Sequence, residues 1–485
     1  MITTLLVSLY ILSASLLALY TGGHGLLLWQ YWRGRTHVDP SPPATTLPTV
    51  TVQLPIYNEQ HVAVRLLDAV ARLDYPSAKL HIQLLDDSTD ITTHVLRARI
   101  RQYPHLQIDH LRRPTRTGYK AGALAYGVAR TTSQYIAIFD ADFIPPPDFL
   151  QRTIPHLQTD ARLCVVQTRW GHLNPDDNWL TRAQVLSIDT HFIIEQAGRY
   201  HGGYPVPFNG TGGVWRRQAI DDAGGWSHAT LTEDLDLSMR AQLRGWRSLY
   251  LPQIVVAGEL PPQLAAYRQQ QARWAQGSSQ NLRRLIGRVW RSDWGLLAKV
   301  MASQHLAQYV PHVLMLLLLL LTPPLLLVDA LHSLPLAPLG IIGLIPPLLY
   351  VVSQRAQGGN WGARLLAFPA LLLIGTGLIW SNSRAVVRGL WQSGGEFRRT
   401  PKFVDRWQGS KYALGVDAVL LQELALMGYA LWGAWLASQH EPALTPYLLL
   451  HALSFATVAL WDMIDQWRIA RARPTSTSMI ESGND

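Results

Sequence analysis

Residues 135–142 read YIAIFDAD, a short apolar run that ends in two aspartates separated by one residue. A run of this length, bounded by polar residues, is typical of a buried β-strand. Residues 49–54 and 81–85 have the same character, and helical periodicity at 60–73, 91–102 and 118–130 alternates with these strands. Strands that alternate with helices predict an α/β domain with a mainly parallel sheet, here over residues 49–260.

Polar residues follow each of the three predicted strands. In open parallel sheets, ligands bind beyond the carboxyl ends of the strands. We therefore expect one site to be formed by Tyr57, Asn58 and Glu59 after the first strand, Asp86, Asp87 and Ser88 after the second, and Asp140 and Asp142 after the third.

Long apolar runs flank this domain, and the whole chain has 48% apolar but only 15% charged residues. That charge content is low for a soluble protein. Residues 2–29 are long enough to cross about 30 Å of hydrocarbon, and they lack the basic start and short apolar core of a cleavable signal peptide. We predict an uncleaved transmembrane anchor at 1–32, with its N-terminus outside, and a proline-containing linker at 33–48.

The net charge is +9, and basic residues cluster beside the apolar runs, at 33–35, 283–291, 384–406 and 468–473. The positive-inside rule predicts this pattern for the cytoplasmic flanks of membrane spans, so we expect no nucleic-acid partner. The single cysteine, Cys164, cannot form an intrachain disulfide and fits a reducing compartment. Its plainer interpretation is a small buried apolar residue.

The C-terminal part of the chain predicts an interfacial segment followed by membrane spans. Residues 261–299 contain a basic amphipathic stretch suited to the membrane interface. Apolar runs follow at 304–328, 339–352, 365–380, 416–436 and 445–461.

The predicted topology follows from orientation. The α/β domain and the basic loop at 381–412 should both be cytoplasmic, so one of the three runs within 300–380 should not span. We favour the run at 365–380, broken by Pro369, Gly375 and Gly377, as re-entrant or interfacial; the short run at 339–352 is the alternative. A transmembrane hairpin at 413–467 and a cytoplasmic tail at 468–485 complete five spans.

The pair Asp140 and Asp142 predicts a divalent-cation site, because Mg²⁺ and similar hard cations prefer oxygen ligands. Such a cation would bridge the diphosphate of a nucleotide and neutralise the charge of the leaving group. Taken alone, an Asp-Ala-Asp triplet is more often a solvated turn, so its place after a strand is what favours the metal.

Two further groups could bind the rest of a nucleotide. Asp86 and Asp87 could accept hydrogen bonds from a base or ribose, although aspartates at strand exits are also common turn formers. Lys120, near the start of a helix, could bind a diphosphate with the help of helix N-terminal amides. Its alternative is a solvated lysine.

Asp234, within Thr232-Glu233-Asp234, could act as a general base that accepts the proton of an attacking hydroxyl. The alternative is a capping threonine followed by acids that favour a helix N-terminus. In the segment 270–274, Arg273 could pair with a diphosphate and Trp274 could stack on a sugar. Interfacial helices also carry Arg and Trp for lipid contacts alone.

These motifs together resemble a known family. PIYNE at 55–59, Asp86-Asp87, Asp140-Ala141-Asp142, Thr232-Glu233-Asp234 and the QxxRW pattern of Gln270, Arg273 and Trp274 occur in order. The set resembles the family-2 glycosyltransferases of the cellulose synthase superfamily. Closer similarity is to the cellulose-synthase-like branch of glucomannan and mannan synthases, carried by TGYKAGAL at 117–124, VQTRWGHL at 166–173, FNGTGG at 208–213 and LTEDLDL at 231–237.

The resemblance implies a GT-A fold inserted between membrane helices and a metal-dependent, inverting transfer of a sugar. It assigns roles by position. Donor contacts would be Tyr57, Glu59, Asp86, Asp87, Lys120, Asp140, Gln270 and Arg273; Asp140 and Asp142 would bind Mg²⁺ or Mn²⁺; Asp234 would be the base; and Asn209, Glu233 and Trp274 would contact the acceptor.

One more match concerns the basic loop at 381–412. Phe397, Thr400 and Lys402 fit the FxxTxK spacing of the gating loop of cellulose synthase, which closes over the donor. Arg399 replaces the usual valine before the threonine, and Pro401 occupies the variable position. The alternative is a basic cytoplasmic loop whose charge alone explains it.

The sequence therefore predicts a processive β-glycan synthase of a bacterial-type inner or plasma membrane, with its catalytic domain in the cytoplasm. Its donor would be UDP-glucose or GDP-mannose, its acceptor a glycan or lipid, and its surroundings membrane lipid. One alternative is a non-processive lipid glycosyltransferase of the ceramide glucosyltransferase type. Another is a transporter that nucleotides regulate, against which the carboxylate set argues.

Overall fold

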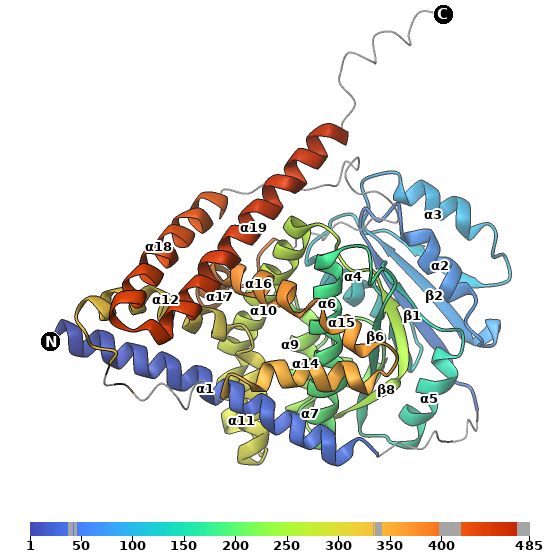
Figure 1. The fold of residues 1–485 in the computed structure, drawn as a ribbon. Helices are drawn as coiled ribbons and strands as arrows, with labels where there is room; N and C mark the ends of the chain where they lie inside the picture. Colours follow the sequence, from blue (N-terminus) through green and yellow to red (C-terminus); the bar gives the residue numbers. More distant parts are fainter. Residues whose placement is uncertain (37–41, 43–45, 333, 335–341, 397–418, 473–485) are drawn as a thin grey trace, which may run out of the picture.

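The computed structural model describes residues 1–36, 42, 46–332, 334, 342–396 and 419–472 (Figure 1). An α/β domain lies at one side of the molecule, and long helices from both ends of the chain extend away from it. The predicted gating-loop residues Phe397, Thr400 and Lys402 lie outside the described residues, as does most of the predicted linker.

The α/β domain is built on one eight-stranded sheet of order β3-β2-β1-β4-β7-β6-β8-β5. Its strands are β1 (Val50–Ile56), β2 (Leu80–Asp86), β3 (Gln107–Leu111), β4 (Tyr135–Ile138), β5 (Phe143–Ile144), β6 (Leu163–His172), β7 (Gly213–Arg216) and β8 (Arg247–Gly258). The predicted α/β class is confirmed, and the three strands used to predict it are β1, β2 and β4.

The sheet is mixed in direction. Strands β3, β2, β1 and β4 are parallel, as predicted. Strand β7 then runs antiparallel to both β4 and β6, and β5 runs antiparallel to β8. Strands β6 and β8 are parallel to each other, so only β7 and β5 run against the other strands, and the prediction of a mainly parallel sheet is confirmed.

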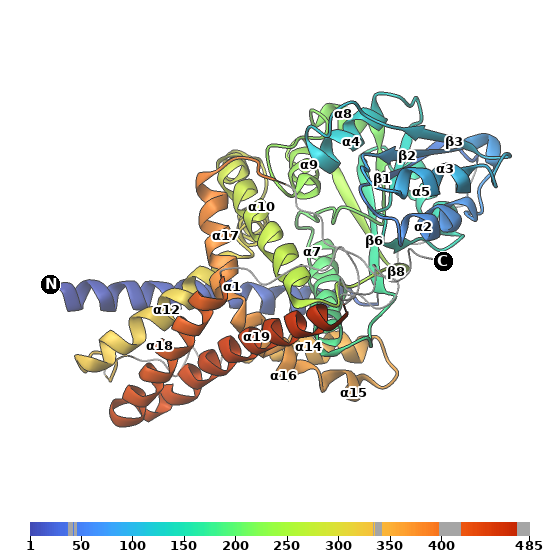
Figure 2. The ribbon, with the colours of Figure 1, turned by 90° about the horizontal axis from the view of Figure 1, so that it is seen from above.

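Helices cover both faces of the sheet, and a separate apolar core fills each side (Figure 2). One face carries α2 (Ala63–Ala71), α3 (Thr92–Ile100) and α5 (Phe149–Thr159). The other carries α4 (Tyr119–Val128), α8 (Arg217–Asp222) and α9 (Glu233–Gln242). Cys164 is buried in the second core, in agreement with its plainer interpretation.

Four helical segments of the described chain are long and apolar enough to cross a membrane. They are α1 (Ile2–Gly34), α12 (Val310–Leu327), α18 (Val419–His440) and the segment Pro442–Ile469, which contains most of α19 (Thr445–Ala472). A bent pair, Trp361–Gly377 with Ile379–Trp391, meets at 48° and would make a fifth span if it crosses as one unit. It comprises α15 (Trp361–Leu365), α16 (Phe368–Gly377) and α17 (Ile379–Trp391).

Helix α14 (Ile345–Ala356) covers much of the apolar run at 339–352. Its 12 residues extend only about 18 Å, too short to cross the hydrocarbon. It packs instead on α6 (Trp179–Thr190), where Gln354 donates to Asp189 at 3.0 Å and the hydroxyls of Ser353 and Thr190 are 2.8 Å apart. The run at 365–380, which the sequence favoured as the non-spanning segment, falls within the bent pair, which is either a broken span or a re-entrant loop.

The predicted amphipathic stretch forms α10 (Leu264–Arg291), followed by α11 (Leu296–Leu306). Near the start of α10, Arg268 is buried between two carboxylates of the C-terminal hairpin. Its NH2 atom lies 3.2 Å from Glu423 of α18 and 2.7 Å from Asp462 of α19. These ion pairs attach α10 to the last two helices of the chain.

We expect Arg268→Ala to lower the free energy of unfolding by about 3–5 kcal/mol, because it leaves two carboxylates buried without their cation. Arg182→Ala is the matched control, since Arg182 forms an exposed ion pair with Asp176 at 3.2 Å. That change should stay within about 0.5 kcal/mol. Denaturation of the detergent-purified chain measures both, and equal losses would contradict the anchoring role of Arg268.

Candidate active site

One cleft lies where the carboxyl ends of β1, β2 and β4 meet the start of α9 and one side of α10. It encloses about 1260 Å³, counting its open mouth. Its wall brings together most of the residues singled out in the sequence, namely Tyr57, Glu59, Asp87, Lys120, Asp140, Asp142, Asn209, Glu233, Asp234, Gln270, Arg273 and Trp274.

Asp86 does not line this cleft. It is buried at the end of β2, where it accepts hydrogen bonds from the Ser88 amide at 2.9 Å and the Thr93 hydroxyl at 2.7 Å and lies 2.8 Å from His110 Nε2. Burial alone would raise its pKa, but these bonds outweigh burial and lower the pKa to about 2. In this structure Asp86 holds the exit of β2, and its contact with a nucleoside stays a prediction.

Asp87 does reach the cleft, and two arginines that the sequence analysis missed surround it. Arg113 binds both carboxylate oxygens of Asp87 and donates to the Tyr119 carbonyl at 3.0 Å. Arg116 lines the cleft with its guanidinium 3.4 Å from the centre of the Tyr57 ring. A basic, proline-containing loop carries no pattern that would single out these two positions.

Lys120 lies at the centre of a buried charge cluster. Its Nζ atom is 2.5 Å from Asp140 Oδ1 and 3.7 Å from Glu233 Oε1, and it donates to the Gly210 carbonyl at 3.0 Å. Burial would lower its pKa, but the charges of Asp140 and Glu233 reverse that effect and raise it. Lys120 is therefore a charged group in the cleft and not the solvated lysine of the alternative interpretation.

Asp140 and Asp142 follow β4 and both line the cleft. Burial raises the pKa of Asp140, Lys120 opposes this, and the neighbouring charge of Asp142 raises it further. A cation bound beside the pair would favour the charged form of both carboxylates. No group of three or more His, Cys, Asp or Glu side chains within the described ranges is placed to hold a metal, so two carboxylates are what the protein offers here.

Asp234 stands in the first turn of α9, with its Oδ1 accepting from the Leu235 amide at 2.9 Å. Burial and the charge of Glu233 raise its pKa to about 7. Thr232 occupies the N-cap position, but its side chain makes no capping bond and instead accepts from Asn281 of α10 at 2.9 Å. The alternative interpretation, in which Thr232 caps α9, is therefore incomplete. The side chain of Thr232 connects α9 to α10 and does not cap α9.

Gly210 allows the loop before β7 to approach Asp234. Its backbone has a φ of +86°, in the left-handed region that favours glycine. A Cβ atom at this position would lie 2.9 Å from Asp234 Oδ2 and 3.4 Å from Lys120 Nζ. Any side chain here would push against the two charged groups that define the cleft.

Helix α10 supplies the remaining wall with Gln270, Arg273 and Trp274. Burial lowers the pKa of Arg273, opposed by the carboxylates of Glu233, Asp234 and Asp140. An arginine nevertheless stays protonated in proteins. The cleft thus has a fixed cation on the helix that the hairpin anchors, facing the acidic groups of the α/β domain.

The segment at 166–173 contributes cleft residues to which the sequence gave no role. Trp170 and His172 both line the cleft. The ring of Trp170 is 4.9 Å from that of Phe143, and His172 Nε2 is 2.9 Å from Asp189 on α6. The same segment carried part of the family resemblance, which was the available signal for these residues.

Comparison with known proteins gives the same family for this domain. Residues 48–277 match the family model described as "Glycosyltransferase like family 2". The chain is 41% identical over 260 residues to "Glucomannan 4-beta-mannosyltransferase 1" of Oryza sativa subsp. japonica, covering 52% of this chain and 50% of that protein. It is 35% identical over 361 residues to "Glucomannan 4-beta-mannosyltransferase 7" of Arabidopsis thaliana, covering 72% and 64%.

A solved structure shares the fold. It is the "Mannosyltransferase PcManGT from Pyrobaculum calidifontis in complex with GDP-Man and Mn2+", with a TM-score of 0.52, 21% identity, and coverage of 78% of this chain and 99% of that chain. This likeness supports the GT-A-like α/β fold predicted from the sequence. The chain spans about half the length of the first curated relatives it matches.

We expect Gly210→Ala to destabilise the protein more than Gly203→Ala. Both glycines have positive φ, +86° and +67°, where an alanine costs about 1–2 kcal/mol. A Cβ at Gly203 meets nothing within 4 Å, whereas at Gly210 it meets Asp234. Thermal unfolding of the two variants isolates that contact, and equal shifts would show that the loop can move away from Asp234.

Proposed function

We propose that the chain, whose residues 48–277 match the model of family-2 glycosyltransferases and resemble glucomannan 4-beta-mannosyltransferases, is a processive, inverting β-glycan synthase that uses GDP-mannose. The observation that carries the proposal is the cleft in which Asp140, Glu233 and Asp234 surround Lys120 and face Arg273. The names of the curated relatives favour mannose over the glucose that the sequence left open.

The two buried cations suit the diphosphate of the donor. Lys120 and Arg273 line the same cleft from opposite elements, α4 and α10. A charged lysine provides a compact point charge and an arginine a planar, bidentate donor. A diphosphate between Lys120 and Arg273 would pair with both cations in place of some of the carboxylates that they contact now. Its contact with Arg273 would orient the leaving group toward α10.

Asp234 is the proposed general base. It would take the proton of an acceptor hydroxyl while that oxygen forms a bond to the anomeric carbon. The bond from this carbon to the phosphate oxygen breaks on the opposite face, and the electron pair leaves with the nucleoside diphosphate. A carboxylate with a pKa near 7 suits this task, because a base is most effective when its pKa lies near the working pH.

Asp140 and Asp142 would hold Mg²⁺ or Mn²⁺. Two carboxylates are enough, because such ions in nucleotide sites take their remaining ligands from phosphate oxygens and water. When bound, the ion would stabilise the charge of the departing diphosphate. Both aspartates line the wall of the same cleft, where carboxylate oxygens could reach an ion held by a diphosphate, and this supports the assignment.

The membrane helices support a polymer product. Helix α10 carries cleft residues and is attached to α18 and α19, so the acceptor wall is continuous with the apolar helices. We propose that the catalytic domain faces the cytoplasm of an inner or plasma membrane and that the glycan passes between these helices. Closure by Phe397, Thr400 and Lys402 stays a prediction outside the described residues.

The nature of the product tests this proposal. The purified full chain in lipid nanodiscs is incubated with GDP-[¹⁴C]mannose or UDP-[¹⁴C]glucose, with MnCl₂ or with EDTA. We expect mannose to enter a high-molecular-weight product that resists lipid extraction and is cut by β-mannanase, only with the metal. Label found wholly in the organic phase would support a lipid glycosyltransferase instead, and no incorporation would favour nucleotide regulation of transport.

We expect Asp234→Asn to reduce sugar transfer by about 100-fold or more, the usual contribution of a general base, while nucleotide binding survives. In the wild type, kcat/KM should rise with pH between about 6 and 8, because the base acts only when deprotonated. Asp176→Asn, on the exposed surface, serves as the control. A variant at Asp234 with unchanged turnover would remove it as the base.

A further inference from the structure

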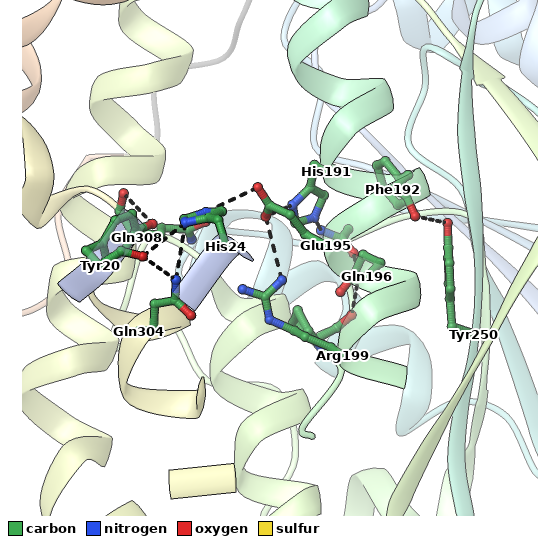
Figure 3. Close-up of polar contacts among 12 residues, drawn as sticks. Tyr20, His24, His191, Phe192, Glu195, Gln196, Arg199, Tyr250, Gln304 and Gln308 are labelled. Atoms are coloured by element: carbon green, nitrogen blue, oxygen red, sulfur yellow. Dashed lines mark hydrogen bonds and ion pairs between the residues drawn. The ribbon is translucent and has the colours of Figure 1, made fainter. Parts of the chain in front are cut away.

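A wide helical turn joins the cleft to the N-terminal helix. Between α6 and α7 (Ala197–His201), residues His191–Gln196 form a π-helical turn, η2. Such turns are rare and often occur at functional sites. From this turn Glu195 reaches toward His24 of α1 and Arg199 of α7 (Figure 3). None of these groups has a part in the chemistry described above.

The direction of the hydrogen bonds at the cleft end of this turn can be deduced from one backbone carbonyl. Gln196 Nε2 lies 3.1 Å from the Pro207 carbonyl oxygen, which can only accept, so this atom is the amide nitrogen. The same Nε2 lies 2.6 Å from Asn209 Oδ1. The Asn209 carbonyl therefore faces Gln196, and its NH₂ group faces the other way.

The next bonds in the chain follow from this orientation. Asn209 Nδ2 lies 3.0 Å from His191 Nε2. Because the amide nitrogen only donates, His191 Nε2 must accept and carries no proton. The proton of the neutral ring is then on Nδ1, which lies 3.1 Å from Glu195 Oε2 and donates to it.

Glu195 is held in its charged form, as this arrangement requires. Its Oε1 lies 3.4 Å from His24 Nε2, and its Oε2 lies 3.6 Å from Arg199 NH1. Burial would raise its pKa, but the bonds from His191 and His24 keep the pKa well below its usual range. Gln304 of α11 in turn donates to His24 and to the Tyr20 carbonyl, at 3.2 and 2.9 Å.

Asn209 is the point at which this network meets the cleft. The residue lines the cleft wall. Its carbonyl is bound to Gln196 and one of its N–H groups to His191. Within the described residues its second N–H has no hydrogen-bond partner, so it is the one group of this side chain left to donate to a ligand.

We propose that His191 is a positioning residue for the acceptor: through its Nδ1-protonated neutral ring, it fixes the Asn209 amide so that the free N–H donates to a hydroxyl of the glycan. Glu195, with His24 and Arg199, fixes the tautomer of that ring. This inference rests on the proposed function, because it assumes a hydroxylated acceptor in the cleft.

The hydrogen bond that His191 Nε2 accepts from Asn209 holds the amide in this orientation. A second proton on Nε2 would set two donors against each other and break the bond to Asn209. The charged and titratable groups around this ring are Glu195 on its own turn, Arg199 on α7, His24 on α1 beyond Glu195, and His305 on α11, whose ring is stacked at 6.4 Å. Three of these four groups come from other elements, so α1 and α11 contribute to the orientation of a cleft residue.

The test measures equilibrium binding of β-1,4-mannohexaose, and of GDP with Mn²⁺, to the full chain in nanodiscs by calorimetry. We expect His191→Phe to weaken oligosaccharide binding by about tenfold, as for one lost hydrogen bond, with GDP binding unchanged. His191→Gln should restore most of the affinity, because its carbonyl can accept from Asn209. The double variant His191→Phe/Asn209→Ala should bind no worse than Asn209→Ala alone.

His81→Phe is the matched control. His81 also bonds to a carboxylate, Asp109, at 2.8 Å, but at the opposite end of the strands from the cleft. The inference would be overturned if His191→Phe kept full affinity for the oligosaccharide or if His191→Gln recovered none of it. It would also be overturned if the double variant lost the product of the two single fold-changes in affinity. So would an equal loss of GDP affinity, which would make His191 a residue that only supports the fold. A wild type that neither binds the oligosaccharide nor transfers sugar would instead overturn the proposed function.

Discussion

Charge balance inside one buried cleft is the constraint on which the rest of the structure depends. Lys120 is close to Asp140 and Glu233, and Arg273 faces the same acidic groups from another helix. Charges buried at this density are tolerated only when their partners are held closely in place. The strand ends, the glycine at 210, the start of α9 and the anchoring of α10 all serve to hold them.

Much of the cleft could be predicted from the sequence, because strand ends in a parallel sheet collect on one edge. Asp86 is instructive as an exception. Adjacent side chains at the end of a strand tend to point in different directions, and nothing in the sequence of the pair identifies which aspartate lines the cleft. In the structure Asp87 lines the cleft, and Asp86 turns toward His110 on the neighbouring strand β3.

The parts that escaped prediction depend on partners distant in the chain. An apolar run reports hydropathy and not what it packs against, so the contacts of α14 with Asp189 and Thr190 could not be predicted from the sequence. Only the structure shows that Arg116 lies over the ring of Tyr57. Only the structure shows that Arg268 pairs with carboxylates on α18 and α19. The reversed direction of β7 and β5 also depends on pairing between distant segments.

The burial of Arg268 also bears on how the protein is made. Glu423 follows Arg268 by 155 residues, and Asp462 lies later still, so α10 leaves the ribosome long before its partners exist. Until the hairpin of α18 and α19 is in place, the helix that carries Arg273 and Trp274 has a cation, Arg268, without these two counter-charges. Completion of the cleft is thus coupled to the insertion of this hairpin, and a chain cut short before Glu423 would lack both partners of Arg268.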